Sequence, residues 1–147
     1  MCCLLYLTLS NWFPIENAMN IEQILSNAPK VLSQFQRKTY FEQGYLFIEG
    51  FIIEDEVQRL LEVTQQFVER SCTETLSGPT FDLAPSHSSN APKIRRLKCP
   101  DTQHDAYWQF AMGKIADVAA DLVGPDVVFH HSKLNFKWND GRDEVQW

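Results

Sequence analysis

The residues with the clearest chemical potential are four cations in the segment KIRRLK, residues 93–98. Lys93, Arg95, Arg96 and Lys98 stand together in a chain of 147 residues whose formal net charge is −6. Ammonium and guanidinium groups at this density can bind an anionic ligand. Charged side chains also keep the edge of a sheet from aggregating, and the pattern alone favours such a solvated edge.

A second group of cations lies near the end of the chain, in DVVFHHSKLNFKW, residues 126–138. This segment predicts a long strand, and strand alternation places Lys133 and Lys137 on one face together with His131 and Asn135. Two lysines on one face are typical of a face in solvent. His130 and His131 point to opposite faces of such a strand, so we expect one packed and one exposed histidine rather than a pair of metal ligands.

Helices and short strands must position these cations. The pattern predicts helices over residues 29–43, 54–70 and 101–123, strands over 44–51, 93–98 and 126–138, and a long loop over 71–92. Residues 54–70 are the clearest helix, because their apolar positions recur on one face and three acidic residues open it. Asn139–Arg142 predicts a hairpin turn, and residues 145–147 begin a return strand. The long loop is of the kind that often covers a binding site.

Composition excludes some functions. The acidic balance argues against a general nucleic-acid surface, which needs a basic footprint. The four cysteines show no zinc or disulfide spacing, which predicts reduced thiols in a cytoplasmic protein, and no segment is long and apolar enough to predict a membrane span. Residues 1–18 are interpreted as a disordered leader or as sequence upstream of a true start at Met19, so the domain is expected over residues 19–147.

Three stretches together resemble the phytanoyl-CoA dioxygenase-like family of non-haem Fe(II)- and 2-oxoglutarate-dependent oxygenases. They are FEQGYLFIEGFIIEDEVQRLLE, the pair Lys93-Ile94, and LVGPDVVFHHSKLNFK followed by a turn and VQW. The resemblance covers about residues 35–147. It implies an α+β fold in which N-terminal helices pack on the first strands of an incomplete double-stranded β-helix (jelly-roll). In such a fold the face of Lys133 and Lys137 can point into the substrate cavity.

The resemblance also implies that this chain carries residues that bind the cosubstrate, whereas the iron ligands would lie beyond Trp147. Lys93 matches a lysine associated with 2-oxoglutarate, and Lys133 falls where relatives place a cosubstrate-contacting residue, commonly methionine. Arg96 and Lys137 are weaker candidates for binding an anion or the substrate. The family's His-x-Asp iron motif would follow Trp147 directly, so the chain is expected to be an N-terminal fragment without catalytic or metal-binding residues of its own.

Two functions therefore remain open. The first is a dioxygenase that hydroxylates a small organic substrate with Fe(II) and 2-oxoglutarate in the complete domain, neither of which is expected to bind tightly to this chain alone. The alternative is a small non-catalytic binding or interaction module that a partner chain completes by adding a strand. An unfinished sheet edge also predicts self-association.

Overall fold

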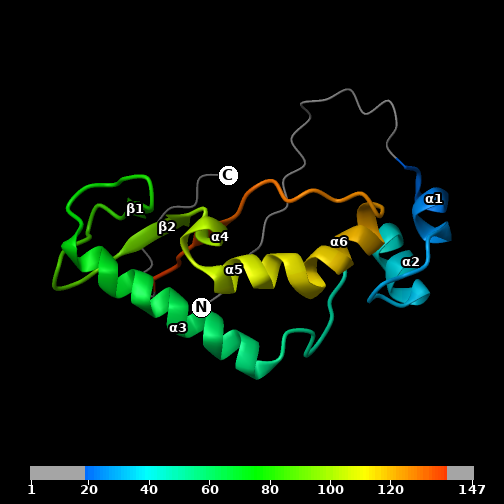
Figure 1. The fold of residues 1–147 in the computed structure, drawn as a ribbon, viewed down its shortest axis with the longest axis horizontal. Helices are drawn as coiled ribbons and strands as arrows, with labels where there is room; N and C mark the ends of the chain where they lie inside the picture. The colour runs from blue at the N-terminus through cyan, green and yellow to red at the C-terminus, as the bar shows by residue number, and fades with distance from the viewer. Residues whose placement is uncertain (1–18, 139–147) are drawn as a thin grey trace. The chain divides into compact units, whose positions relative to one another are not determined.

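A computed structural model describes residues 19–138 of the chain (Figure 1). The helices are α1 (Ile21–Ser26), α2 (Gln34–Gln43), α3 (Glu54–Arg70), α4 (Pro100–Gln103), α5 (Asp105–Phe110) and α6 (Ala116–Val123). The strands are β1 (Phe81–Leu83), β2 (Ile94–Lys98) and β3 (Lys133–Asn135). A 3-10 turn at Ser71–Thr73 follows α3, and a π-helical turn at Ala111–Ile115 precedes α6.

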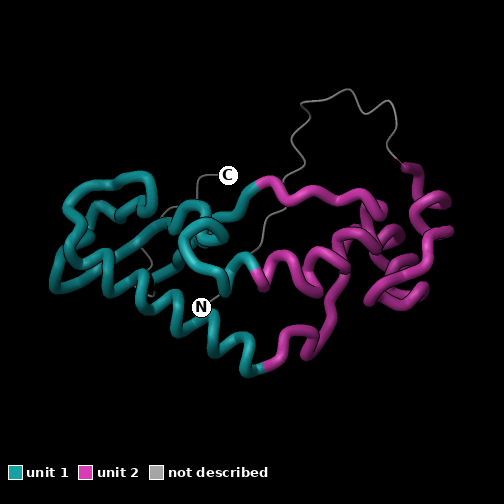
Figure 2. The backbone as a smooth tube through the Cα atoms, in the orientation of Figure 1, with its two compact units in different colours: residues 1–7, 54–108, 131–147 teal, residues 8–53, 109–130 magenta. Residues whose placement is uncertain are grey.

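The described residues divide into two compact units (Figure 2). Unit 1 contains residues 54–108 and 131–138, and unit 2 contains residues 19–53 and 109–130. The predicted α+β composition is present, since unit 1 holds an antiparallel sheet in the order β1-β2-β3. A double-stranded β-helix stays a prediction.

A β-bulge in β2 explains how one strand serves both the core and the charged surface. Asp82 pairs with Arg96 whereas Leu83 pairs with Ile94, so Arg95 is an extra residue on β2. The bulge lets Ile94 and Leu97, three positions apart, both reach the core, where each is 0% exposed. Arg96 therefore lies on the opposite face of the sheet.

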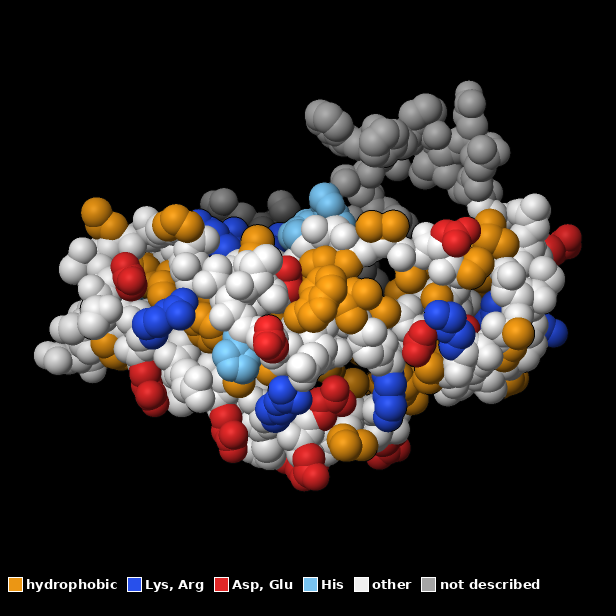
Figure 3. Space-filling model, viewed as in Figure 1, with side chains coloured by type: hydrophobic (Ala, Val, Ile, Leu, Met, Phe, Trp, Pro, Cys, Tyr) orange, Lys and Arg blue, Asp and Glu red, His pale blue; other side chains and the backbone are white. Residues whose placement is uncertain are grey.

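Helix α3 covers the core face of this sheet, and its bounds are those predicted from the sequence. Val63 and Phe67 from α3 pack into the same cluster as Phe81 and Leu97. The guanidinium of Arg70 lies 4.5 Å from the centre of the Phe67 ring, a favourable cation–π distance. Acidic side chains of α3 line the lower edge of the molecule in Figure 3.

In unit 2, α1 and α2 each begin with a capping box, from Asn20 and Ser33 respectively. Because the Ser33 hydroxyl accepts from the amide of Gln36, α2 begins at Gln34, five residues later than predicted. Gly44 ends α2 in the left-handed conformation, at φ 79°, as the sequence predicts. Phe35, an apolar residue of α2, is 79% exposed.

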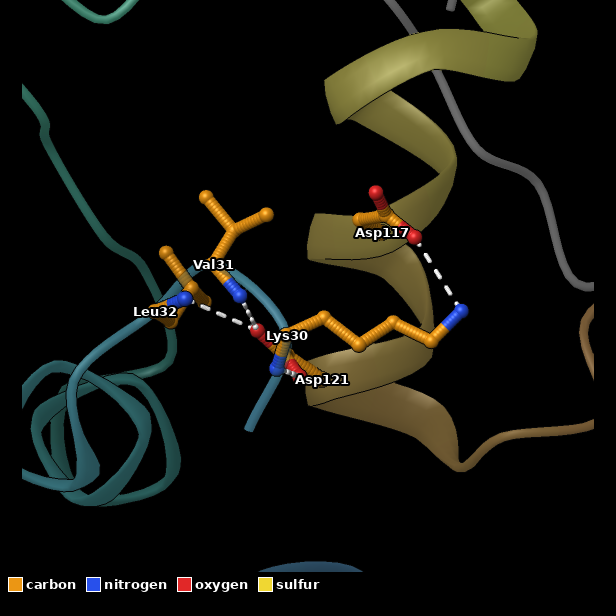
Figure 4. Close-up of polar contacts among 5 residues, drawn as sticks. All are labelled: Lys30, Val31, Leu32, Asp117 and Asp121. Carbon is orange, nitrogen blue, oxygen red and sulfur yellow. Dashed lines mark hydrogen bonds and ion pairs between the residues drawn. The ribbon is translucent and has the colours of Figure 1, made fainter. Parts of the chain in front are cut away.

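The centre of unit 2 is polar and fully bonded. The Asp121 carboxylate, in a residue 2% exposed, accepts the backbone N–H groups of Lys30, Val31 and Leu32 at 2.8–2.9 Å (Figure 4). Arg37, 1% exposed, donates to the carbonyl oxygen of Asp121. Burial by itself raises the pKa of Asp121, but the three backbone donors and the Arg37 charge outweigh it and hold the pKa below its ordinary value.

Guanidinium nitrogens of Arg37 also donate to the carbonyl oxygens of Asn27 and Ile24 and to the side chain of Gln34. Arg37 thus adds donors to the carbonyls at the C-terminal end of α1, where the Ile24 carbonyl oxygen also accepts from the Asn27 amide at 3.2 Å. This one side chain joins α1, α2 and α6.

One predicted strand is absent, and another is shorter than predicted. Residues 44–51 form no strand, because no neighbouring strand lies beside them among residues 19–138 to complete a ladder. Of residues 126–138 only Lys133–Asn135 are a strand, since these are the residues that face β2. Val128, within the predicted strand, is 89% exposed.

The predicted helix over residues 101–123 is interrupted twice. His104 is extended, at φ −158° and ψ 133°, and ends α4. Gly113 adopts φ −84° and ψ −137°, which breaks the helix before α6. Within α5, Ala106 and Tyr107 are buried, whereas Trp108 is 44% exposed.

Candidate functional site

Arg96 occupies the centre of the sheet face opposite the core. Its Nε donates to Oδ1 of Asn135 on β3 at 3.1 Å, and its Nη1 lies 3.8 Å from Oδ2 of Asp82 on β1. The guanidinium is therefore oriented by both neighbouring strands. Its side chain stays 41% exposed, so an anion from solvent can reach it.

Lys98 and Lys133 face each other across the β2–β3 ladder on the side of Arg96. Like charges in directly opposite positions repel. The Lys98 ammonium is drawn to the β1 side by a 2.9 Å bond to the carbonyl oxygen of Gly78, which separates it from the exposed Lys133. A bound anion on this face would lower the same repulsion.

Lys93 is half-buried and stands immediately before β2. Its backbone N–H donates to Nδ1 of His87 at 2.9 Å, and its carbonyl oxygen accepts from the amide of Ala84 at 2.9 Å. The loop before β2 thus fixes the Lys93 backbone on both sides. The sequence pattern did not single out His87, because a histidine in a loop of small polar residues has no periodic signature.

Lys137 lies away from this face, on a groove of about 760 Å³ within unit 1. The groove is lined by Leu61, Glu62, Thr64, Gln65, Gln66, Val68 and Glu69 of α3 and by Phe136, Lys137 and Trp138. The indole N–H of Trp138 donates to the carbonyl oxygen of Ile94 at 2.8 Å. The indole also stacks on the ring of Phe136, with the two ring centres 6.0 Å apart. Two carboxylates and one ammonium line this groove, so its charge does not by itself favour an anion.

The structure brings some of the predicted residues together. Arg96 and Lys133 lie on adjacent strands and on one face, two positions apart in register. Because β2 and β3 are antiparallel, Lys93 and Lys137 lie at the other end of the strand pair. Along the strand, Lys93 and the level of Lys133 are roughly 15 Å apart, so both could contact one small dicarboxylate only through their long side chains.

The candidate metal ligands are the His, Cys, Asp and Glu side chains. No group of three or more His, Cys, Asp or Glu side chains within residues 19–138 is arranged to hold a metal ion. His130 and His131 are both exposed, and the expectation that one would be packed is wrong because their segment is not a strand. The predicted hairpin, the return strand and the predicted leader lie outside the described residues.

None of the helices within residues 19–138 combines the length and apolar character needed to cross a membrane.

The fold and the cationic sheet face together define an α+β unit that presents positive charge to solvent. No protein-family model matches the chain, and no solved structure matches it. The chain is similar to a probable alpha-ketoglutarate-dependent hypophosphite dioxygenase from Stutzerimonas stutzeri, with 28% identity over 113 residues. The match covers 76% of this chain and 39% of the relative's length. This distant, partial similarity supports a relation to the 2-oxoglutarate-dependent oxygenases at the level of the superfamily.

Proposed function

We propose that the chain is the N-terminal portion of a non-haem Fe(II)- and 2-oxoglutarate-dependent dioxygenase of the phytanoyl-CoA dioxygenase-like type. The observation that carries the proposal is the 113-residue similarity to a dioxygenase whose name includes this cosubstrate. The cationic residues of unit 1 support it, because they lie within a chain whose net charge is −6. Such a local concentration of positive charge suits a dicarboxylate.

In this proposal the described residues bind the cosubstrate and do not hold the metal. Lys93 takes one carboxylate of 2-oxoglutarate, and Arg96 and Lys133 supply positive charge on the adjoining sheet face. Iron would be held by residues outside the described part of the chain. Once bound, iron and 2-oxoglutarate supply the oxidising chemistry that hydroxylates the substrate.

The substrate is proposed to be a small organic molecule. The name of the similar protein specifies hypophosphite, a small anion. Hypophosphite is therefore included in the panel of candidate substrates. Lys137, exposed at the α3 groove, is a weaker candidate for contact with an anionic group of the substrate, because Glu62 and Glu69 of the same groove offset its charge.

A specific observation favours the alternative, a non-catalytic module completed by a partner chain. Tyr45 and Phe47 are 64% and 80% exposed on a non-helical, apolar segment that pairs with no strand among residues 19–138. An apolar segment of strand-like sequence is the kind of surface to which another chain adds a strand. A second copy of this chain could fill the same role.

The deciding experiment begins with the natural coding DNA beyond the codon for Trp147. The longest open frame is expressed, loaded with Fe(II) without oxygen, and tested for succinate formation from 2-oxoglutarate with organic acids, acyl-CoA esters and hypophosphite. The proposal predicts an in-frame His-x-Asp and succinate formation that falls in the Lys93→Ala and Arg96→Ala proteins. Lys114→Ala removes an exposed cation from unit 2 and serves as the matched control.

A stop codon directly after Trp147 would contradict the proposal that the chain is part of a dioxygenase. So would a protein that binds no iron and forms no succinate with any member of the panel. In that event the alternative predicts a stable complex with a partner chain or a second copy of this chain. Light scattering should detect this complex, and Phe47→Asp should dissociate it.

A further inference from the structure

We infer that His87 is a positioning residue for Lys93: its imidazole fixes the Lys93 backbone and thereby directs the ammonium that takes a carboxylate of 2-oxoglutarate. This inference rests on the proposed function, because it assigns a supporting role within the same site. It adds a residue that the sequence pattern did not indicate.

The two contacts of the His87 ring require one and the same protonation state. The Lys93 amide donates to Nδ1 at 2.9 Å, so Nδ1 must present a lone pair. Nε2 lies 3.1 Å from the carbonyl oxygen of Glu74, which can only accept, so Nε2 must carry the proton. The ring is therefore the neutral Nε2–H tautomer, bonded at both nitrogens.

The loop that carries His87 is itself fixed at several points. The His87 amide donates to the carbonyl oxygen of Ala84, and the Ala84 amide donates to the carbonyl oxygen of Lys93, both at 2.9 Å. Ser88 and Ala91 form an isolated antiparallel bridge that closes the loop. The position of the imidazole is therefore held by a loop whose own backbone is hydrogen-bonded.

Both backbone groups of Lys93 are consequently bonded to this loop. The next residue, Ile94, is 0% exposed and anchors the strand in the core. With its backbone bonded on both sides and its neighbour buried, Lys93 has little freedom to change the direction in which its side chain leaves the strand.

Two conservative variants separate the two bonds of the ring. In His87→Asn the side-chain oxygen takes the place of Nδ1 and keeps the bond to the Lys93 amide. In His87→Gln the side-chain nitrogen takes the place of Nε2 and keeps the bond to Glu74 alone. The geometry points to retention of function in the asparagine protein and loss in the glutamine protein.

The test is steady-state kinetics of the complete protein with 2-oxoglutarate as the varied substrate. We expect the KM for 2-oxoglutarate to rise about tenfold in His87→Ala and His87→Gln, with kcat unchanged, as the loss of one positioning hydrogen bond predicts. In His87→Asn the KM should stay within about twofold of the parent. His104→Ala is the matched control, because His104 Nδ1 accepts a comparable 3.1 Å bond from the Ala106 amide outside this loop.

Hydrogen exchange of the Lys93 amide provides a readout that does not depend on activity. The amide should exchange faster in His87→Gln and His87→Ala than in the parent and His87→Asn proteins. Equal KM values for the asparagine and glutamine proteins, or a fall in kcat in both, would overturn the inference while leaving the dioxygenase in place. A parent protein that neither binds nor consumes 2-oxoglutarate overturns the proposed function and this role of His87 with it.

Discussion

The Asp121 carboxylate gives the sharpest test of how unit 2 is held together. Its Oδ1 accepts from the Lys30 amide at 2.8 Å, and its Oδ2 accepts from Val31 and Leu32 at 2.9 and 2.8 Å. In Asp121→Asn one oxygen becomes an NH₂ group. The best orientation keeps the oxygen toward Val31 and Leu32 and leaves the amide donor facing the Lys30 N–H group.

The expected cost follows from these contacts. Two charge-assisted bonds become neutral ones, which costs about 1 kcal/mol each, and the third is replaced by two opposed donors, at about 1 kcal/mol or more. We therefore expect Asp121→Asn to lower the free energy of unfolding by about 3 kcal/mol. For a chain of this size that loss lowers the midpoint of urea unfolding by about 1.5 M.

Asp117→Asn is the matched control. Asp117 lies one turn earlier on α6, and its Oδ1 pairs with the Lys30 ammonium at 3.0 Å, with the two side chains 44% and 51% exposed. An exposed pair of this kind contributes about 0–1 kcal/mol. Urea unfolding followed by circular dichroism compares the two proteins, and an Asp121→Asn midpoint within about 0.3 M of the control would refute the reasoning.

Three further outcomes are expected. Because the folded-state pKa of Asp121 is lowered, its stabilisation is present above about pH 4 and is lost as the pH falls through the folded pKa, so unfolding curves of parent and Asp121→Asn should converge in acid. Leu97→Ala, at a side chain 0% exposed, should lower the free energy of unfolding by about 3 kcal/mol in urea, against less than about 0.5 kcal/mol for Leu76→Ala, at 79% exposed. Gly124→Ala should lower the melting temperature whereas Gly78→Ala should not, because Gly124 has φ +114° and ψ 164°, a conformation costing other residues about 1–3 kcal/mol.

The sequence predicts those elements whose stability is local. Helix 54–70 has one apolar face, acidic residues at its start and a basic residue at its end, and these suffice to define α3. The end of α2 at Gly44 follows the same logic, whereas its start is predicted too early, at residue 29, because the cap at Ser33 is not recognised from the pattern.

The sequence fails where an element depends on a distant partner. Residues 44–51 have strand propensity, but a strand needs a neighbour for its backbone bonds, and the described residues provide none. The burial of Arg37 and Asp121 is also hidden, because periodicity counts charged residues as exposed. Their burial depends on backbone donors and acceptors from three helices and the loop before α2, which no single segment encodes.

The candidate site shows the same limit. The cations of residues 93–98 are visible in the sequence, and the alternation of Ile94 and Leu97 already departs from strict period two. The bulge at Arg95 explains that departure, and it becomes apparent only when β1 supplies the register. His87 is out of reach of sequence reasoning, since its role depends on a hydrogen bond to the backbone of a residue six positions away.

The bulge has a consequence for testing any ligand of this face. Since Ile94 and Leu97 anchor β2 in the core, the strand is held independently of the cations on its other face. Arg96 is 41% exposed and its pair with Asp82 spans 3.8 Å, so Arg96→Ala should change the free energy of unfolding by no more than about 1 kcal/mol. A loss of anion binding in that protein, with an unchanged unfolding midpoint, would therefore report on the ligand contact itself. Loss of both together would place Arg96 among the residues that hold the sheet.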